Sequence, residues 1–291
     1  MTLSTTIQNF LLERRAARYS PNTLRCYRVT FDKLVDFFGD IAIQQITRIK
    51  IIEFLDNQEN VSAKTLRNYH ADLSALWQWA VQRGLCDENI IRSIRAPIAE
   101  KKEVVPFERT EIVALINQAT QSANQEVAHR NKAIIYTLLD TGVRASEMCG
   151  LKIQDINQVT MHITVFGKGR KERRIPISET TLSTIKNYLD QRTGKSDWVF
   201  TTLNNRPINR NRLADILEAV GGRAGVARAH PHRFRHTFAI QFLRNGGSIY
   251  SLQRILGHTT LDMVKRYLAI SQIDLDRDHA LASPVARWLH H

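Results

Sequence analysis

The chain has 291 residues, of which 43% are hydrophobic and 8% aromatic, and its 41 Lys and Arg against 28 Asp and Glu give a formal net charge of +13. This composition is too apolar for a disordered chain, and no apolar run approaches the roughly 20 residues that a membrane span needs. The cysteines lie far apart, at positions 26, 86 and 149, which excludes a disulfide framework and a Cys-x-x-Cys zinc module. We expect a soluble protein of a reducing compartment.

The positive charge is concentrated in the second part of the chain. Residues 101–291 hold 28 Lys and Arg against 17 Asp and Glu, whereas residues 1–100 hold 13 against 11. A basic surplus attracts polyanions, and nucleic acid is the commonest polyanion inside a cell. A generally basic enzyme is the alternative that charge alone leaves open.

The first hundred residues have the pattern of helices. Ser4 or Thr5 can cap a first helix that continues to about residue 15. Ser20 followed by Pro21 is a common helix start, and apolar residues at helical spacing lead from there to Gly39, where the helix should end.

The pattern Ser-x-x-Thr-Leu-Arg-x-Tyr occurs twice, at residues 20–27 and 62–69. A helix N-terminus that carries Ser, Thr and Arg is suited to binding phosphate. For either copy alone, an ordinary core helix with a normal cap is the better interpretation. The repetition makes DNA contact equally good, with these candidate residues: Thr23, Arg25, Thr65 and Arg67.

Prolines and charges break the periodicity around residues 95–106, a composition typical of a linker. We predict an N-terminal domain over residues 1–98, a linker over 99–106 and a second domain over 107–291. The second domain begins with helices, one of them from about residue 131 to 139.

A β-hairpin is expected next in the second domain. Residues 161–166 and 172–177 alternate around a turn at Gly167-Lys168-Gly169, and residues 153–156 are a candidate third strand. From residue 179 onward the pattern is helical to the end.

Four short groups carry residues suited to a phosphate site. In the first, Gly142 breaks a helix, Arg144 heads the next one and can bind an anion, and Glu147 can orient its guanidinium. The second is the hairpin tip at Lys168, which lacks the P-loop pattern and by itself is most often a solvated basic turn.

The third group contains His232 and His236 at a spacing that also occurs in zinc sites. Arg233 stands where the zinc motif has Glu, and Arg235 beside both rings would repel a metal, so we expect none. Imidazole and guanidinium on one helix fit a phosphate site better, arginine supplying charge and histidine proton transfer.

The fourth group is Leu-Gly-His258, followed nine residues later by Tyr267. A lone tyrosine at helical spacing from apolar neighbours usually belongs to the core. Beside Lys265 and Arg266, however, a tyrosine can be a nucleophile that attacks a phosphate, because cations stabilise the charge that develops.

Taken together, these groups resemble the tyrosine recombinases, also called the lambda-integrase family. The order of the motifs carries the resemblance: Arg144, Lys168, His232-x-x-Arg235, Leu-Gly-His258 and Tyr267. The layout is similar to Xer recombinases and to integrases of transposons and conjugative elements. The resemblance implies a mostly α-helical fold with a small antiparallel sheet, in which an N-terminal helical bundle, the core-binding domain, precedes a mixed α/β catalytic domain.

The resemblance also implies the roles of individual residues. Arg144 and Arg235 would hold the non-bridging oxygens of the scissile phosphate. Tyr267 would attack the phosphorus and leave a 3′-phosphotyrosyl link and a free 5′-hydroxyl. Lys168 would protonate the leaving oxygen, and His232 would act as general acid and base.

The remaining matched residues have supporting roles in the family. His258 would hydrogen-bond the phosphate, Glu147 would support the site, and His236 is more structural than catalytic. Arg170, on the hairpin, is a candidate DNA contact. One departure is visible: Arg233-Phe234 stands where many members have Asp-Leu, a position outside the catalytic roles.

The implied function is site-specific DNA recombination through a Holliday junction, for integration, excision or resolution, without metal, cofactor or ATP. The implied partner is double-stranded DNA with an inverted-repeat core site, on which free monomers form a homo-tetramer and exchange their C-terminal tails. A type IB topoisomerase and a catalytically silent DNA-binding protein are the alternatives. We expect a cytoplasmic, nucleoid-associated protein with no membrane partner.

Overall fold

The computed structural model describes residues 1–98, 105–167, 172–258, 260–261, 264, 267, 279, 283 and 285. The chain divides into two compact units, Met1–Lys102 and Glu103–His291. Each unit has a hydrophobic core of its own. Within the described part of the chain, no helix combines the length and apolar character required to cross a bilayer.

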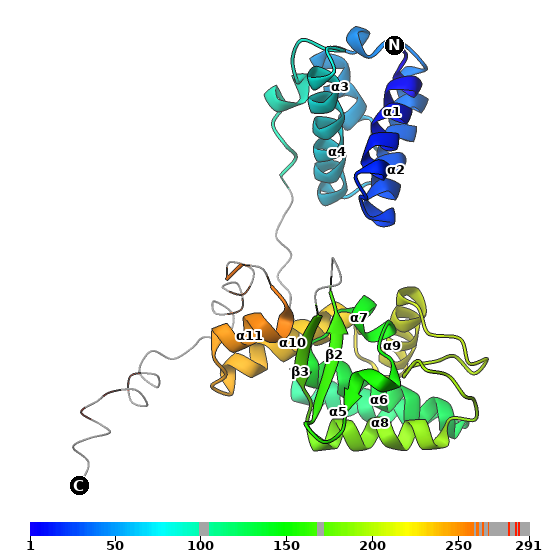
Figure 1. Ribbon diagram of the computed structural model, residues 1–291. Helices are drawn as coiled ribbons and strands as arrows, with labels where there is room; N and C mark the ends of the chain where they lie inside the picture. Colours follow the sequence, from blue (N-terminus) through cyan, green and yellow to red (C-terminus); the bar gives the residue numbers. More distant parts are fainter. Residues whose placement is uncertain are drawn as a thin grey trace. The chain divides into compact units, whose positions relative to one another are not determined.

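The N-terminal unit is a helical bundle (Figure 1). Helix α4 packs against the three others and supplies the two buried tryptophans of the core, Trp77 and Trp79. Phe10 of α1 meets Trp79 and Phe31 edge-on, an arrangement that aromatic rings favour. The elements are α1 (Leu3–Ala16), α2 (Pro21–Phe38), α3 (Arg48–Asp56) and α4 (Ala63–Gln82), with short 3-10 helices at Ile43–Gln45 and Ile90–Ser93.

The repeated sequence pattern begins α2 and α4 in the same way. Ser20 is the N-cap of α2, and its hydroxyl accepts the backbone N–H of Thr23 at 3.1 Å. Ser62 caps α4 and accepts the N–H of Thr65 at 3.2 Å. The two N-termini therefore have equivalent local geometry, and α2 ends at the predicted Gly39.

The first helix begins earlier than predicted. Its N-cap is Thr2, so the expectation of Ser4 or Thr5 is wrong. The reason is tertiary: Leu3 is completely buried in the bundle, and its N–H donates to the carbonyl of Ile41 at 2.8 Å. This contact draws the start of the chain into the core and into the helix.

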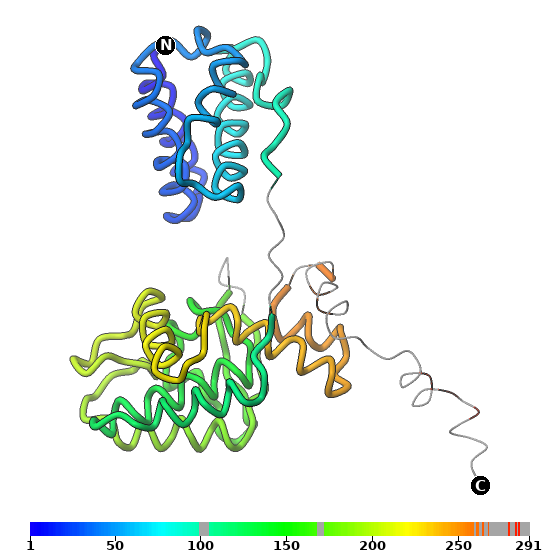
Figure 2. The backbone as a smooth tube through the Cα atoms, turned by 180° about the vertical axis from the view of Figure 1, so that it is seen from behind, coloured from blue at the N-terminus to red at the C-terminus, as the bar shows by residue number. Residues whose placement is uncertain are grey.

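The second unit is built around α6, which packs against α5, α8 and α10. In the two opposite views α9 and α11 lie at opposite sides of the unit, with α10 between them (Figures 1 and 2). The helices are α5 (Arg109–Ala119), α6 (Gln125–Thr141), α7 (Ala145–Cys149), α8 (Glu179–Gln191), α9 (Arg210–Ala224), α10 (Pro231–Arg244) and α11 (Ile249–Leu256), with a 3-10 turn at Ile153–Asp155.

A small antiparallel sheet of order β1-β2-β3 lies beside these helices, with β1 at Ile156–Asn157, β2 at His162–Phe166 and β3 at Glu172–Pro176. Ile163 pairs with Ile175, and both face the core. The predicted third strand begins only at Ile156, because Asp155 accepts the N–H of Lys152 and closes a turn before it. The mostly helical fold with a small antiparallel sheet is confirmed.

Candidate active site

The break between α6 and α7 places the first predicted site residue. Gly142 ends α6 in the left-handed region, with φ +58°, where glycine is the least strained residue. Arg144 follows as the N-cap of α7. Its backbone N–H donates to Oε2 of Glu147 at 2.8 Å, and its Nη1 donates to Oε1 at 2.9 Å.

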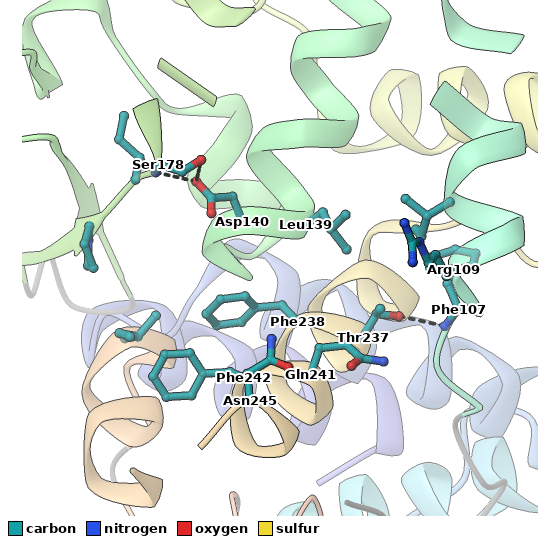
Figure 3. Close-up of a pocket in the computed structure, with 14 residues that line it drawn as sticks. Phe107, Arg109, Leu139, Asp140, Ser178, Thr237, Phe238, Gln241, Phe242 and Asn245 are labelled. Carbon is teal, nitrogen blue, oxygen red and sulfur yellow. Dashed lines mark hydrogen bonds between the residues drawn. The ribbon is translucent and has the colours of Figure 1, made fainter. Parts of the chain in front are cut away.

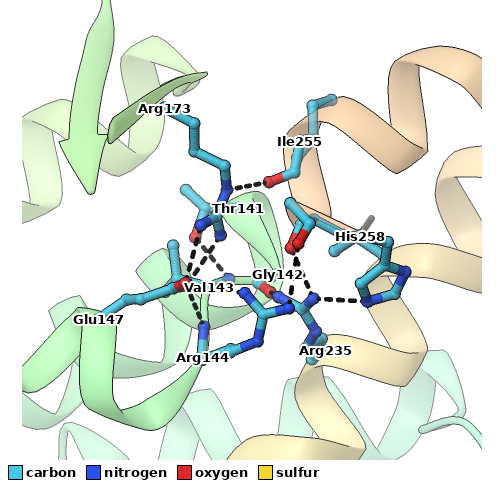
Figure 4. Close-up of polar contacts among 11 residues, drawn as sticks. Thr141, Gly142, Val143, Arg144, Glu147, Arg173, Arg235, Ile255 and His258 are labelled. Atoms are coloured by element: carbon cyan, nitrogen blue, oxygen red, sulfur yellow. Dashed lines mark hydrogen bonds and ion pairs between the residues drawn. The ribbon is translucent and has the colours of Figure 1, made fainter. Parts of the chain in front are cut away.

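Arg235 reaches the same place from the buried side of α10. Its Nη1 donates to the carbonyl of Gly142 at 2.6 Å, and its Nη2 donates to the carbonyl of Leu256 at 2.8 Å (Figure 4). Arg144 donates to the next carbonyl, that of Gly257, at 3.3 Å. Two guanidinium groups from different helices therefore converge on the turn that ends α11.

His258 lies directly after this turn and completes the cluster. Its Nε2 is 2.9 Å from Nη2 of Arg235. Because a guanidinium has only donors, Nε2 accepts this hydrogen bond. The structure thus brings three predicted catalytic residues, Arg144, Arg235 and His258, into one network.

The charges in this network act on one another. Burial, together with the neighbouring charge of Arg144, lowers the pKa of Arg235 to about 10, and the charge of Glu147 acts in the opposite direction. A pKa of that value leaves the guanidinium charged at neutral pH. The cluster consequently offers two positive charges to an anion at pH 7.

Glu147 has a second partner that sequence reasoning missed. Arg173 of β3 donates to both carboxylate oxygens, at 2.7 and 2.8 Å. Burial alone would raise the pKa of the Glu147 carboxyl, but hydrogen bonds from Arg173 and Arg144 hold it below its usual value. The carboxylate is therefore ionised while it is almost completely buried, with 2% of its side chain exposed.

The other two described residues of the predicted catalytic set are His232 and Tyr267. His232 is exposed on the first turn of α10, one turn before Arg235. The ring of Tyr267 is 1% exposed, within an apolar cluster formed with α10 and α11, and its centroid lies 5.4 Å from that of His236. Tyr267 therefore packs in a core, as the first interpretation of this residue expects, and its assignment as nucleophile stays a prediction.

Comparison with known proteins decides the family. Residues 107–272 match the family model described as "Phage integrase family", and residues 7–87 match "Phage integrase, N-terminal SAM-like domain". The chain belongs to the phage integrase family. It is 32% identical to tyrosine recombinase XerC of Pelobacter propionicus over 277 residues, covering 92% of this chain and 91% of that protein. Tyrosine recombinase XerC of Staphylococcus carnosus is 28% identical, over 96% of this chain and 97% of that protein.

Solved structures share the fold. The Tn1549 transposon integrase in complex with a circular intermediate DNA matches with a TM-score of 0.80 at 19% identity, covering 97% of this chain and 99% of that one. A lambda integrase dimer bound to a core site matches with a TM-score of 0.75 at 18% identity, covering 90% and 97%. The family models and the XerC relatives confirm the predicted membership of the tyrosine recombinases, and with it the class of site-specific recombinase. The topoisomerase alternative is not favoured.

The remaining predicted site residues either lie outside the described residues or belong to the N-terminal unit. Lys168 and Arg170 lie outside the described residues, as does most of the tail after Tyr267. The candidate DNA contacts stand at helix starts in the N-terminal unit, where Arg25 and Arg67 are exposed. Among the described residues, no group of three or more His, Cys, Asp or Glu side chains could hold a metal ion.

A cavity of about 710 Å³ lies elsewhere in the second unit of the recombinase, and none of the predicted catalytic residues lines it. Figure 3 shows residues that line it, among them Phe238 and Phe242 of α10 and Leu139 of α6, and Asp140, which accepts hydrogen bonds from Ser178. Its lining is mainly apolar, so it does not resemble a phosphate site.

Proposed function

We propose that this recombinase cuts a DNA strand by attack of Tyr267 on a phosphodiester whose non-bridging oxygens are held by Arg144 and Arg235. The observation that carries this assignment is the convergence of the two guanidinium groups on neighbouring carbonyls, those of Leu256 and Gly257. A phosphoryl-transfer transition state gathers negative charge on the non-bridging oxygens, and fixed cations stabilise it without reorganisation.

The proposed reaction balances without a cofactor. The Tyr267 oxygen bonds to phosphorus, the bond to the 5′-oxygen breaks, and Lys168 gives that oxygen a proton. His232 takes the phenolic proton and returns it in the reverse step, while His258 hydrogen-bonds the phosphate. A 5′-hydroxyl from another strand then displaces the tyrosine, so the phosphotyrosyl bond conserves the energy of the diester and ATP is not needed.

We further propose how the domains divide the work. Residues 1–98 would be the core-binding domain, which contacts double-stranded DNA through the starts of α2 and α4; residues 99–106 would be the linker; and residues 107–291 would cut the DNA, with Arg170 as a further contact. The solved relatives described above are complexes with DNA, which supports this partner.

Membership of the tyrosine recombinase family supports a proposal for how the protein assembles on DNA. Free monomers would pair on an inverted-repeat core site, and two occupied sites would form a homo-tetramer that exchanges strands through a Holliday junction. The C-terminal tail would pass between protomers. Such a protein would work in the bacterial cytoplasm, on the nucleoid.

The nucleophile is tested with a nicked DNA substrate that releases a short fragment on cleavage and so traps the covalent protein–DNA adduct. Tyr267→Phe keeps the buried ring and should abolish the adduct while DNA binding survives in a mobility-shift assay. Tyr250→Phe is the matched control, because it removes the same hydroxyl from an exposed tyrosine of α11. Adduct formation by Tyr267→Phe would refute the assignment.

A further inference from the structure

Arg173 occupies an unusual place for an arginine, on the core-facing side of β3. It pairs with the buried Val165 across the sheet, and Ile175, two residues further along the strand, is completely buried. The neighbouring Arg174 points to the opposite, exposed side. Only 13% of the Arg173 side chain is exposed, so its charge requires a partner inside the protein.

That partner is Glu147, and every nitrogen of the Arg173 guanidinium donates a hydrogen bond. Two nitrogens of the Arg173 guanidinium donate to the two carboxylate oxygens, and the third, Nε, donates to the carbonyl of Ile255 at 2.7 Å (Figure 4). Arg173 therefore joins β3 to α7 and to the end of α11. Planar paired bonds of this kind fix both partners in orientation, which a lysine cannot do.

The same guanidinium supports the turn that both phosphate-binding arginines contact. A Cβ atom added to Gly257 would lie 3.0 Å from Nη1 of Arg173 and 3.1 Å from its Cζ. Arg173 thus packs directly against Gly257, whose carbonyl accepts from Arg144. A displaced Arg173 would move this turn and with it the start of the segment that carries His258.

The charge of the cluster depends on Arg173 as well. Glu147 carries one negative charge, against which stand the positive charges of Arg144, Arg173 and Arg235, a surplus of two. Without Arg173 the surplus falls to one, and the buried carboxylate has Arg144 as its remaining ion-pair partner among the described residues.

We propose that Arg173 is a positioning residue for strand cleavage: it takes up the charge of Glu147, so that the charge of Arg144 remains available to the scissile phosphate. The inference rests on the proposed function, because it assigns Arg144 to that phosphate. It adds a residue on β3 that touches no reacting atom and acts through Glu147 and the turn at Gly257.

The test compares two DNA substrates. One has an ordinary phosphodiester at the scissile position, and the other has a methylphosphonate, in which a methyl group replaces one non-bridging oxygen and removes the negative charge. Cleavage is measured at saturating DNA for wild type, Arg173→Met, Arg173→Lys and the control Arg174→Met, which removes one positive charge from the exposed face of the same strand.

Arg173→Met should cleave the ordinary substrate about 10- to 100-fold more slowly than wild type, less than the roughly 100- to 1000-fold that loss of a donor in direct contact costs, because Arg173 acts through Glu147. On the methylphosphonate the variant should be within about threefold of wild type, because a neutral phosphate demands less positive charge. Arg173→Lys keeps the charge and loses the paired geometry, so its cleavage rate on the ordinary substrate should lie between those of Arg173→Met and wild type. Arg174→Met should change the cleavage rates of the two substrates by the same factor.

A second variant separates electrostatics from folding. Adding Glu147→Gln to Arg173→Met removes the unbalanced carboxylate and should recover part of the rate on the ordinary substrate. Equal losses on both substrates, or no recovery in the double variant, would overturn the inference. Failure of the proposed function itself has a different signature, an adduct that persists in Tyr267→Phe.

Discussion

Replacement of Gly142 by alanine tests whether the close packing around the helix break holds the site together. A Cβ atom there would lie 2.3 Å from Cδ1 of Phe238 and 3.0 Å from Cδ2 of Leu256. The backbone also has φ +58°, which strains any residue with a side chain. The perturbation reaches the site directly, because the Gly142 carbonyl accepts from Arg235.

The magnitude follows from two separate costs. A left-handed backbone costs a residue with a Cβ about 1–2 kcal/mol, and an additional methyl group in a packed core costs about 1–3 kcal/mol. Gly142→Ala should therefore lower the free energy of unfolding by roughly 2–5 kcal/mol. Gly225, the cap of α9, has φ +68° and no atom within 4 Å of the added Cβ, so Gly225→Ala should bear only the first cost.

Urea denaturation of the full chain, followed by circular dichroism, measures both losses, and the nicked substrate measures cleavage. We expect Gly142→Ala to be less stable than Gly225→Ala and to cleave more slowly. Shortening the obstructing side chain, in Gly142→Ala with Phe238→Leu, should recover part of the stability. If the two glycine variants lose the same free energy, the contact with Phe238 does not constrain this turn and the reasoning is wrong.

Four further outcomes are expected. Lys168→Ala should cleave an ordinary phosphodiester poorly but recover on a substrate with sulfur at the 5′-bridging position, since a thiolate leaves without a proton donor; equal defects on both substrates would contradict the assignment. Cleavage should continue in excess EDTA, and abolition with rescue by Mg²⁺ would overturn the metal-free mechanism. The logarithm of DNA affinity should fall linearly with the logarithm of salt concentration, and Arg25→Gln combined with Arg67→Gln should reduce the magnitude of that slope by about 2. An unchanged slope would show that neither arginine contacts a DNA phosphate. The folded-state pKa of Glu147 is below its usual value, so the stabilisation that its carboxylate provides is present above the unfolded pKa of about 4.3 and is lost as pH falls through the folded value. As pH is lowered from about 6 to 3, the urea midpoint of unfolding should therefore drop less steeply for Glu147→Gln than for wild type. Parallel plots of midpoint against pH for the two proteins would contradict the ion pairing.

Local signals explain most of what the sequence alone predicts correctly. Ser20 before proline and Gly142 before Arg144 act within one helical turn, so their effects do not depend on distant contacts. The hairpin is predicted because alternation and turn glycines are also local. Thr2 is the first cap, in place of the predicted Ser4 or Thr5, because the burial of Leu3 in the bundle determines where the helix begins, and no local pattern predicts that burial.

The pairing of Glu147 with Arg173 depends on contacts between separate elements, and the sequence analysis therefore did not predict it. Alternation along β3 could have shown that Arg173 shares a face with the apolar Ile175, which marks it as an arginine that needs an internal partner. It could not have named Glu147, 26 positions earlier, because their meeting depends on how α7 and the sheet pack. Tyr267 likewise satisfied both the core and the nucleophile interpretation, since its spacing fits either.

Arg233, which departs from the family pattern, makes structural contacts and is not part of the proposed phosphate site. Its guanidinium donates to the carbonyls of Val105, Pro106 and Ala227, forms an ion pair with Glu111 at 2.8 Å and lies over the ring of Phe107 at 4.0 Å. These contacts use Nε and both terminal nitrogens. The cation is therefore committed to fastening the segment that enters the second unit onto α10, the helix that also carries His232 and Arg235. An Asp at this position would have no donors for those carbonyls and would repel Glu111. The change thus alters how α10 is anchored, and the two arginines that converge at Gly142 keep their own contacts.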